Sequence, residues 1–550
     1  MLYKELAVYY ERLENTPKKL EKADILAELY SRSGSALSKI VLLSMGIVYS
    51  QGELDLGIAA EMMKRVISKC CGASEKDLEK KFKETGDLGL SAEFFISRKK
   101  QLTLARKELT VDMVFGNLRK LPEISGKSSQ ERKISLISEL MSHASGKEAK
   151  YLVRTVIGEM RIGVSIGLAR NAIAKAFDRA EKEVEEAFDI VGDYGKVAEM
   201  ARSGSLKVEP ETGSPIRVML ADRAPNLKTA LEAFEHPALE VKLDGFRAQI
   251  HKSPAGVKIF SRRMDDVTRQ FPEIAKLAKS CITAGEAIVE GEILAVTKEN
   301  YPLPFQSLSR RIQRKYDIER MVKEIPVRID LFDMIYLNGE SFMKSPFRKR
   351  WESLNKIISP AKGFCLIEHI ETKELNEAEK FYKHSLAIGE EGIIVKNLDA
   401  HYQPGKRVGY WLKVKPIMDP LDLVIVGGTW GEGKRAKWIG SLFLAARSQE
   451  TGEFLPTGML GSGLTDEQLE DVTRKMKKIL TSESGRDVSV RPQIVVEVAY
   501  EEIQKSPKYP SGYALRFPRL LRFRDNEKKP EDADTLQTIE KLFKNQRSRK

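Results

Sequence analysis

Cysteine is scarce in this chain, and the few cysteines are not spaced for a metal site or a disulfide scaffold. The 550 residues include four, none in a CxxC pair: Cys70, Cys71, Cys281 and Cys365. Because adjacent cysteines rarely bond each other, the sequence disfavours both a disulfide-based fold and a thiolate zinc site. We therefore expect any catalytic metal to have oxygen ligands.

Long apolar runs are also missing. The longest uncharged apolar stretch, residues 40–52, is too short to cross a bilayer. The first residues, MLYKE, lack the basic and then apolar segment of a secretion signal. We expect no membrane association and an intracellular protein, cytoplasmic or, in a eukaryote, nuclear.

The composition is that of a globular protein with a basic bias. Hydrophobic residues make up 42% of the chain, which excludes disorder as its main state. At about 150 residues per domain, the length predicts three or four domains. The 92 Lys+Arg exceed the 79 Asp+Glu, a net charge of +13 that is compatible with a nucleic-acid partner. Residues 1–210 hold 35 Lys+Arg and 31 Asp+Glu, so any nucleic-acid affinity of this region would depend on where the charges lie.

The hydrophobic period changes twice along the chain. Apolar residues recur at helical spacing up to about residue 210, where the turn-rich segment EPETGSP follows. Strand-like runs of period two come next without regular strand–helix alternation, which predicts a largely antiparallel α/β domain. Short strand-like runs between glycine turns end the chain and favour a small β-barrel. We predict three domains: residues 1–212 (all-α), 213–416 (α/β) and 417–550 (β-barrel).

The segment EVKLDGFR, which begins at Glu240, carries the most chemical information. On a strand, alternation places Glu240, Lys242 and Asp244 on one face. Gly245 then permits a bend, and Arg247 lies on the returning chain. For a lone E-x-K-x-D strand, the simpler interpretation is a solvated edge that carries an ion pair.

The longer pattern K-x-D-G-x-R is rare by chance and changes that interpretation. It resembles the adenylation motif of covalent nucleotidyltransferases, the superfamily of ATP-dependent DNA ligases, RNA ligases and mRNA capping enzymes. The resemblance implies that the amine of Lys242 attacks a nucleotide α-phosphate and forms a phosphoramidate. This chemistry requires a neutral amine. It also implies nucleotide contacts for Arg247 and recognition of the adenine amino group by Glu240.

Three further segments resemble family motifs in the expected order. FSRR, which ends at Arg263, resembles the second motif and implies that Arg262 contacts the nucleotide. EGE, which ends at Glu292, resembles the third and implies a ribose or metal contact for that residue. Phe332 matches the aromatic residue that stacks on the base, although an isolated Phe in such an apolar strand is more often a core residue.

Two later segments complete the resemblance. EGIIVK implies that Glu391 binds the divalent ion, with a one-residue shift to Glu390 left open. WLKVK resembles the fifth motif, and alternation places Lys413 and Lys415 on one face. Two ammonium groups so close repel unless an anion lies between them, and a triphosphate is a suitable anion. Arg407 stands at the family's spacing for a further phosphate contact.

Over nearly its whole length the chain is similar to ATP-dependent DNA ligases of the archaeal and eukaryotic replicative type. That type has a helical DNA-binding domain, an adenylation domain and an OB-fold domain, matching the three predicted domains. The segment from Leu515 to Arg524 is similar to the sixth ligase motif, which contacts the β and γ phosphates. A capping enzyme is not expected to carry the long helical domain.

The resemblance implies an enzyme that seals nicks in duplex DNA through a lysine–AMP intermediate, in replication, repair and recombination. It implies ATP as AMP donor, Mg²⁺ or Mn²⁺ as metal and a monomer, and it leaves a sliding clamp open as a partner. Two alternatives remain: an RNA ligase or capping-type nucleotidyltransferase, and a non-enzymatic DNA-binding scaffold. The sequence does not decide whether ADP or NAD replaces ATP.

Overall fold

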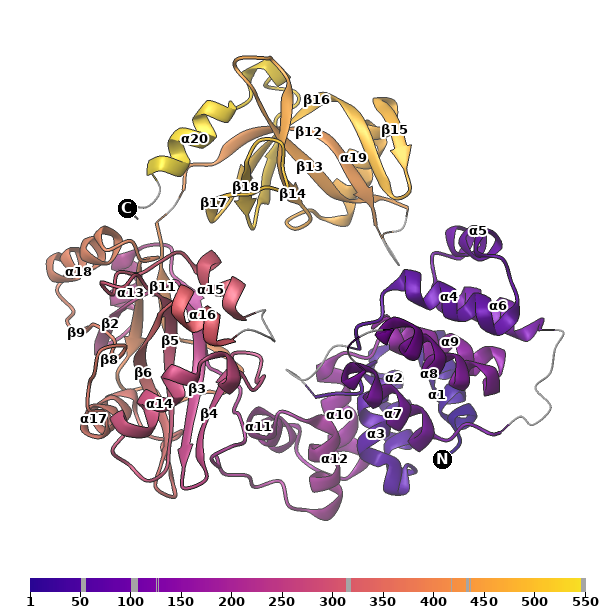
Figure 1. Ribbon diagram of the computed structural model, residues 1–550, viewed down its shortest axis with the longest axis horizontal. Coiled ribbons are helices and arrows are strands. Elements are labelled where there is room, and N and C mark those ends of the chain that lie inside the picture. Colours follow the sequence, from indigo (N-terminus) through magenta and orange to yellow (C-terminus); the bar gives the residue numbers. More distant parts are fainter. Residues whose placement is uncertain are drawn as a thin grey trace. The chain divides into compact units, whose positions relative to one another are not determined.

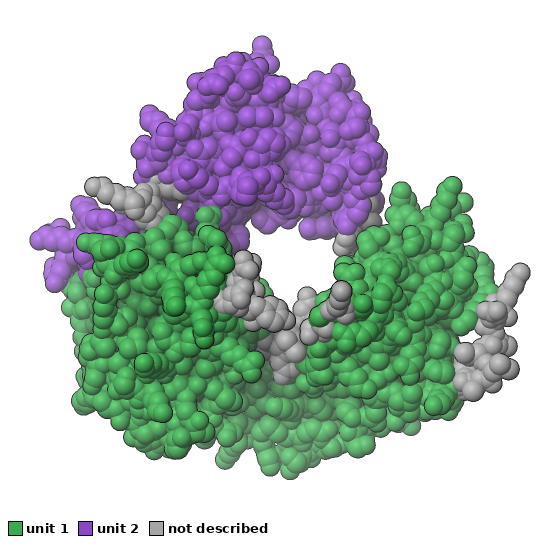
Figure 2. Space-filling model, in the orientation of Figure 1, with its two compact units in different colours: residues 1–224, 230–373, 394–412 green, residues 225–229, 374–393, 413–550 purple. Residues whose placement is uncertain are grey.

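The computed structural model describes nearly the whole chain, namely residues 1–50, 56–99, 107–124, 126, 128–312, 318–416, 418–431, 435 and 437–545. The chain forms two compact units (Figure 2). Unit 1 comprises Met1–Ala224, Ala230–Lys373 and Ile394–Leu412, and unit 2 comprises Pro225–Thr229, Glu374–Ile393 and Lys413–Lys550. Within the described ranges, no helix has the length and apolar character needed to span a bilayer. Residues 51 and 52 of the apolar stretch lie outside the described residues.

The N-terminal part of unit 1 is helical (Figure 1). Among its described residues the α-helices are α1 (Tyr3–Asn15), α2 (Lys19–Ser31), α3 (Leu37–Ser44), α4 (Ala60–Cys71), α5 (Glu75–Thr85), α6 (Leu88–Ser97), α7 (Val111–Lys120), α8 (Ser129–His143), α9 (Gly146–Val156), α10 (Ile166–Ala176), α11 (Glu181–Val191) and α12 (Tyr194–Ser203). Local sequence sets several of their ends. Ser145 and Glu148 form a capping box at the start of α9, and Gly192 ends α11 with a positive φ of 71°.

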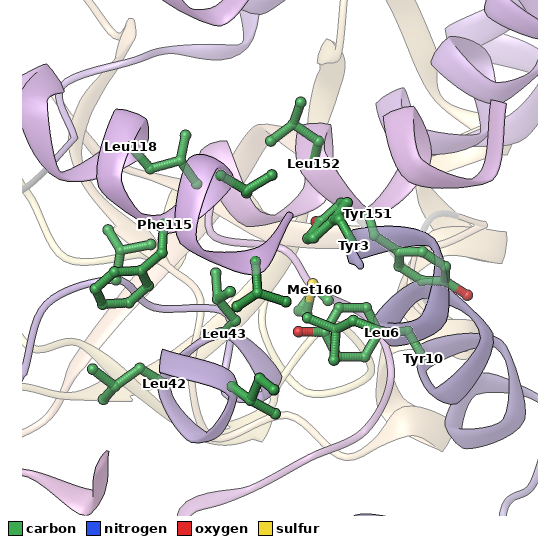
Figure 3. Close-up of a cluster of buried hydrophobic side chains, with 14 of the residues drawn as sticks. Tyr3, Leu6, Tyr10, Leu42, Leu43, Phe115, Leu118, Tyr151, Leu152 and Met160 are labelled. Carbon is green, nitrogen blue, oxygen red and sulfur yellow. The ribbon is translucent and has the colours of Figure 1, made fainter. Parts of the chain in front are cut away.

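A continuous apolar core joins these helices. Tyr3, Leu6 and Tyr10 of α1 are fully buried and lie against Tyr151 and Leu152 of α9 (Figure 3). The Tyr10 and Tyr151 rings meet edge to face, with centroids 5.2 Å apart. The i, i+3, i+4 spacing of apolar residues in the sequence therefore corresponds to one shared hydrophobic interior.

The central α/β part carries the sheets that position the candidate site. Its strands are β1 (Leu220–Arg223), β2 (Pro237–Val241), β3 (Phe246–Ser253), β4 (Gly256–Ser261), β5 (Ala287–Ala295), β6 (Val327–Leu337), β7 (Glu340–Ser341), β8 (Phe364–Leu366), β9 (His369–Glu371), β10 (Ile393–Asn397) and β11 (Arg407–Val414). The helices are α13 (Leu227–Glu232), α14 (Pro272–Cys281), α15 (Phe305–Ile312), α16 (Ile318–Glu324), α17 (Phe347–Ile357) and α18 (Leu375–Ala387).

These strands form two sheets. One has the order β1-β11-β10-β2-β9, and the other has the path β4-β3-β5-β6-β7 with β8 beside β6. The pairs β3–β4, β3–β5 and β5–β6 are antiparallel. On the second sheet α14 packs against β4 and α17 against β6. Arg350 of α17 is fully buried and donates to Asp333 of β6 at 2.8 Å, which anchors that helix.

The C-terminal part of unit 2 is rich in strands. They are β12 (Leu421–Trp430), β13 (Ile439–Arg447), β14 (Phe454–Leu460), β15 (Leu480–Ser484), β16 (Asp487–Ala499), β17 (Glu502–Lys505), β18 (Tyr513–Arg516) and β19 (Arg519–Phe523), with helices α19 (Asp466–Lys478) and α20 (Leu536–Asn545). The main sheet runs β14-β13-β12-β16-β15, and β19 pairs with β16. Leu423, Ile425 and Val496 belong to its buried core.

The predicted fold class is confirmed: a helical N-terminal part, a central α/β part and a strand-rich C-terminal part follow one another. One local prediction is wrong. β2 ends at Val241, so Lys242 and Asp244 follow the strand instead of continuing its face. The predicted boundaries at residues 212 and 416 stay predictions.

Candidate nucleotide site

Lys242 lies directly after β2, at the point where the chain turns into β3. Gly245 makes this turn possible because its backbone lies very close to the neighbouring strand β5. A Cβ atom at Gly245 would lie 2.5 Å from the carbonyl oxygen of Ile293 in β5. Because such a contact is impossible for any other residue without a shift of backbone, the glycine fixes how closely the lysine segment approaches β5.

The strands β3 and β5 present a shared polar face. In their register Arg247 pairs with Glu292 and Gln249 with Glu290, so the four side chains share one side of the sheet. Glu290 is fully buried. It accepts hydrogen bonds from Arg247 at 2.7 Å, Gln249 at 3.2 Å and Tyr402 at 3.1 Å. These donors offset the desolvation of the carboxylate and hold the guanidinium of Arg247 in place.

Arginines gather beside this face. Arg262 follows β4, and it lines a cavity of about 340 Å³ together with Arg217 and Arg263. Burial lowers the pKa of Arg262, and the nearby charges of Arg247 and Arg407 lower it further. Guanidiniums that repel one another at a cavity indicate a site for an anion, because a phosphate between them would remove the repulsion.

Phe332 lies in β6 within a cluster of rings and cations. Its side chain is buried, and the edge of its ring meets Trp411 with centroids 6.0 Å apart. The Arg247 guanidinium lies 5.3 Å from the Phe332 centroid, and the Lys396 ammonium lies 4.7 Å from it. Phe332 is therefore a core residue of the sheet that also borders the arginine-lined face.

Glu240 of β2 is held from both neighbouring strands. Its side chain is 2% exposed and lies 2.5 Å from the ammonium of Lys396 in β10. On the other side His369 of β9, its direct cross-strand partner, donates from Nδ1 to the second carboxylate oxygen at 3.2 Å. Both oxygens of Glu240 therefore have a fixed partner.

Unit 2 contains the fourth-motif glutamate and the fifth-motif lysines. Lys415 lies 2.9 Å from Glu391 and 3.3 Å from Glu501. Arg516 of β18 lies 4.0 Å from the same Glu391 and donates to Glu502 at 3.1 Å. Together these five residues line a cavity of about 380 Å³. Arg516, from the segment that resembles the sixth motif, thus lies in the same cluster of charged residues as the fourth-motif Glu391 and the fifth-motif Lys415.

The expected site residues fall into two groups. In unit 1 the strands β2, β3, β5, β6 and β11, with the segments after β2 and β4, carry Glu240, Lys242, Arg247, Arg262, Glu292, Phe332 and Arg407. Unit 2 carries Glu391, Lys413 and Lys415. Of the two adjacent glutamates, Glu391 is the one that pairs with Lys415.

Sequence reasoning missed the residues that support this site. The EGE segment contains Glu290, and the EGIIVK and WLKVK segments contain Lys396 and Trp411, but the resemblance gave none of these three residues a role. A signal existed for Lys396, because it ends the EGIIVK segment and alternation places it on a strand face with Ile394. His369 had no signal, since only the pairing of β2 with β9 brings it to Glu240.

The donor chemistry fits a hard divalent cation bound together with a phosphate substrate. Mg²⁺ is commonly held by one or two carboxylates and by substrate phosphates. Glu292 is partly exposed and lies opposite Arg247 in the strand register, and the Glu391 carboxylate contacts the ammonium of Lys415. Each carboxylate therefore lies beside a cation that could also bind a phosphate. Across the described part of the chain, no cluster of three or more acidic, His or Cys side chains is arranged for a metal.

Comparison with known proteins gives matches along the chain. The family model described as "ATP dependent DNA ligase domain" matches residues 218–415. "DNA ligase N terminus" matches residues 2–174, and "ATP dependent DNA ligase C terminal region" matches residues 435–527.

Curated relatives match over the full length. A DNA ligase of Thermococcus onnurineus (strain NA1) is 42% identical, covering 99% of this chain and 98% of the relative. A DNA ligase of Archaeoglobus fulgidus is 40% identical, covering 99% of both. The solved structure named "Pmar-Lig_PreS3" shares the fold, with a TM-score of 0.61 at 18% identity, covering 94% of this chain and 99% of that one. On these full-length matches, the chain belongs to the ATP-dependent DNA ligase family.

Proposed function

We propose that this protein seals nicks in duplex DNA with ATP as the AMP donor, and that Lys242 carries the AMP. Its amine attacks the α-phosphate of ATP, a P–N bond forms, and pyrophosphate leaves. The nick 5′-phosphate then attacks the lysine-bound phosphorus, so AMP moves to the DNA and the amine is released. Finally the 3′-hydroxyl attacks that 5′-phosphorus, a phosphodiester forms and AMP leaves.

The observation that carries this proposal is the place of Lys242 between two kinds of support. On one side of it in the chain is β2, which carries the buried Glu240 two residues before the lysine. On the other side is Arg247, which Glu290 holds in place. Arg262 and Arg407 add positive charge to the same face. Phosphoryl transfer depends mainly on positioning and on stabilisation of phosphate charge, and these residues supply both.

The remaining site residues have roles in binding the nucleotide. We assign the adenine base to Glu240 and to the ring of Phe332, and the phosphates to Arg247, Arg262, Arg407, Lys413 and Lys415. Glu292 and Glu391 would hold Mg²⁺. When bound, the ion neutralises charge on the phosphate oxygens. Lys415 would exchange its contact with Glu391 for one with a phosphate, because both are anionic oxygen acceptors.

The helical part would bind the duplex. We propose the division at residues 1–212 (DNA binding), 213–416 (adenylation) and 417–550 (OB-fold). Support comes from the three family models, which match separate stretches of the chain. The small positive charge of the helical part means that only a local basic surface would contact phosphates.

Substitution of Lys242 tests the proposal. We expect Lys242→Ala to lose all transfer of label from α-labelled ATP to protein, while binding of nicked DNA stays within about twofold, because only the nucleophile is removed. Labelling is read by gel after denaturation, and DNA binding by a mobility shift.

Lys252→Ala is the matched control. Lys252 lies on β3, the strand that follows Lys242 in the chain, and its ammonium donates to the carbonyl oxygen of Lys279 at 3.0 Å, away from the arginine-lined face. We expect this variant to label as wild type does. Covalent labelling that persists in the Lys242→Ala protein would contradict the proposal.

A further inference from the structure

A buried charge cluster lies in the sheet that leads to Lys242. Glu240 occupies β2, between β10 and β9 in the strand order. Lys396 reaches Glu240 Oε2 from β10, and His369 reaches Oε1 from β9. Because an ionised carboxylate only accepts hydrogen bonds, Nδ1 of His369 must be the protonated ring nitrogen. The Trp351 ring stacks on His369 at 4.3 Å and keeps it in this orientation.

Lys396 is buried among aromatic rings, where a lysine needs a strong charged partner. Its side chain is 2% exposed. The ammonium lies 4.4 Å from the ring centroids of both Phe347 and Trp411 and 4.7 Å from that of Phe332. It also donates to the carbonyl oxygen of Phe332 at 3.1 Å. One lysine thus contacts both residues that we assign to the base, Glu240 through its charge and Phe332 through ring and backbone.

We propose that Lys396, supported by His369, is a positioning residue that sets the preference for adenine over guanine. This inference rests on the proposed nucleotide site. Lys396 fixes the Glu240 carboxylate relative to the Phe332 ring. Each carboxylate oxygen has a second lone pair, so Glu240 can still accept from a base while both protein partners stay bound.

The chemistry follows from hydrogen-bond polarity. The adenine edge offers an exocyclic amino donor, whereas guanine offers a carbonyl acceptor at the same position. An ionised carboxylate accepts from the first and repels the second. If the Lys396 ammonium is removed, Oε2 of Glu240 loses its ion-pair partner, and the carboxylate is no longer fixed relative to the Phe332 ring. A carboxylate that can move distinguishes the amino donor from the carbonyl acceptor less strictly, so discrimination weakens.

Burial also acts on the lysine. Desolvation lowers the pKa of Lys396, and the negative charges of Glu240 and Asp333 counteract this effect. The charged form of the lysine therefore depends on its contact with Glu240. Because the two side chains are in direct contact, substitutions at the two positions should be strongly coupled.

The test compares self-adenylation with ATP and self-guanylation with GTP in the full-length protein. Lys396→Met keeps the length of the side chain and removes the charge. We expect its KM for ATP to rise about tenfold, and the ATP-to-GTP ratio of kcat/KM to fall at least about tenfold. His369→Gln, which keeps one side-chain donor, should reduce the ratio less. Lys252→Met is the control and should leave both values unchanged.

Coupling to Glu240 separates a positioning role from loss of folding. In the double variant Glu240→Gln/Lys396→Met we expect the ratio to equal that of Glu240→Gln alone, because the lysine acts through that carboxylate. A protein that is only partly unfolded loses both reactions equally and keeps its ratio.

An unchanged ratio in Lys396→Met, whether the protein is stable or destabilised, would overturn the inference. Additive effects in the double variant would do the same. A wild-type protein that takes no label from ATP would instead refute the proposed function, so the two failures are distinct.

Discussion

At the scale of single residues, Gly245 decides how Lys242 is presented. The φ/ψ freedom of glycine matters less here than its lack of a side chain. A Cβ atom would meet the Ile293 carbonyl at 2.5 Å and the Glu292 side chain at 2.8 Å. Any larger residue would push the segment after β2 away from β5, and with it the candidate nucleophile.

We therefore expect Gly245→Ala to reduce self-adenylation by about tenfold or more, because a displacement of about 1 Å at a reacting group has a cost of that size or larger. Initial rates of label transfer at saturating ATP measure the effect. Gly116→Ala is the control, since a Cβ atom there meets nothing within 4 Å and alanine favours the helix. Wild-type rates in Gly245→Ala would show that the close approach is unimportant.

The two glutamates of β5 show what sequence patterns can and cannot resolve. Period two predicts that Glu290 and Glu292 share one face of their strand, and the register with β3 places Arg247 and Gln249 opposite them. It could not show that Glu290 is fully buried and bound by Arg247, Gln249 and Tyr402. Tyr402 reaches Glu290 only through the tertiary fold, so no local pattern in the sequence contains this contact.

At the scale of elements, buried ion pairs join helices of the N-terminal part. Arg154 of α9 is 2% exposed, and its guanidinium binds Glu14 of α1 at 3.1 Å and Asp87, the N-cap of α6, at 2.7 Å. Lys150 lies 2.8 Å from the same Glu14. Three helices therefore meet at one cluster of charges, and loss of one partner leaves buried charge uncompensated.

This cluster predicts acid sensitivity. Burial favours the neutral form of Glu14, but Arg154 and Lys150 outweigh it and lower the pKa of Glu14 to about 2. Because the folded-state pKa lies below the unfolded value, the stabilisation is complete above about pH 4.5 and disappears as pH falls toward 2.

We expect Glu14→Gln to destabilise the protein by about 1 to 3 kcal/mol at pH 7 and by roughly half as much at pH 3, where the Glu14 pKa of about 2 has not yet been reached. Thermal unfolding at both pH values measures the two effects. The control is Glu131→Gln, whose carboxylate is 61% exposed and pairs with Arg65, with an expected effect near zero. Equal losses for Glu14→Gln at both pH values would contradict the assignment.

The charge that the basic segment near the C-terminus offers to a ligand could not be inferred from its composition. Residues 513–524 contain four arginines and no acid in the sequence. In the structure Arg516 pairs with Glu502, Arg522 with Glu497, and Arg524 with Asp422. Strand pairing supplies the acids from distant parts of the chain, so charge density along the sequence overstates the charge available to phosphates.

At the scale of the whole molecule, the order of the three parts was predictable because hydrophobic periodicity differs between helices and strands. The division into compact units was not predictable from that periodicity. The compact units cut the central part at Lys373 and Leu412, since α18 and the end of β11 belong with the C-terminal strands. Sequence period reports local structure, whereas membership of a unit depends on which elements pack together.

The helical part also contacts the start of the central part. Asp189 of α11 binds Arg217 at 3.0 Å, and Glu185 of α11 binds Lys406, the residue before Arg407, at 3.0 Å. These contacts connect the proposed DNA-binding part with the edge of the nucleotide site.

Removal of residues 1–212 tests the proposed division of labour. We expect the truncated chain to retain self-adenylation within about threefold, because the contacts to Arg217 and Lys406 lie at the periphery of the site. Sealing of nicked duplex should fall at least about tenfold at moderate salt, since the proposed DNA contacts are removed. Parallel assays of label transfer and nick sealing measure the two. Unchanged sealing would show that the helical part does not hold the DNA.

The most direct test of the central claim is to map the covalent adduct by peptide mass spectrometry after the wild-type protein has been incubated with ATP and the divalent ion. The account predicts one AMP on the peptide that contains Lys242, and its disappearance when nicked duplex DNA is added, as the nicks become sealed. An adduct on another residue, or sealing by a protein that never carries AMP at Lys242, would contradict it.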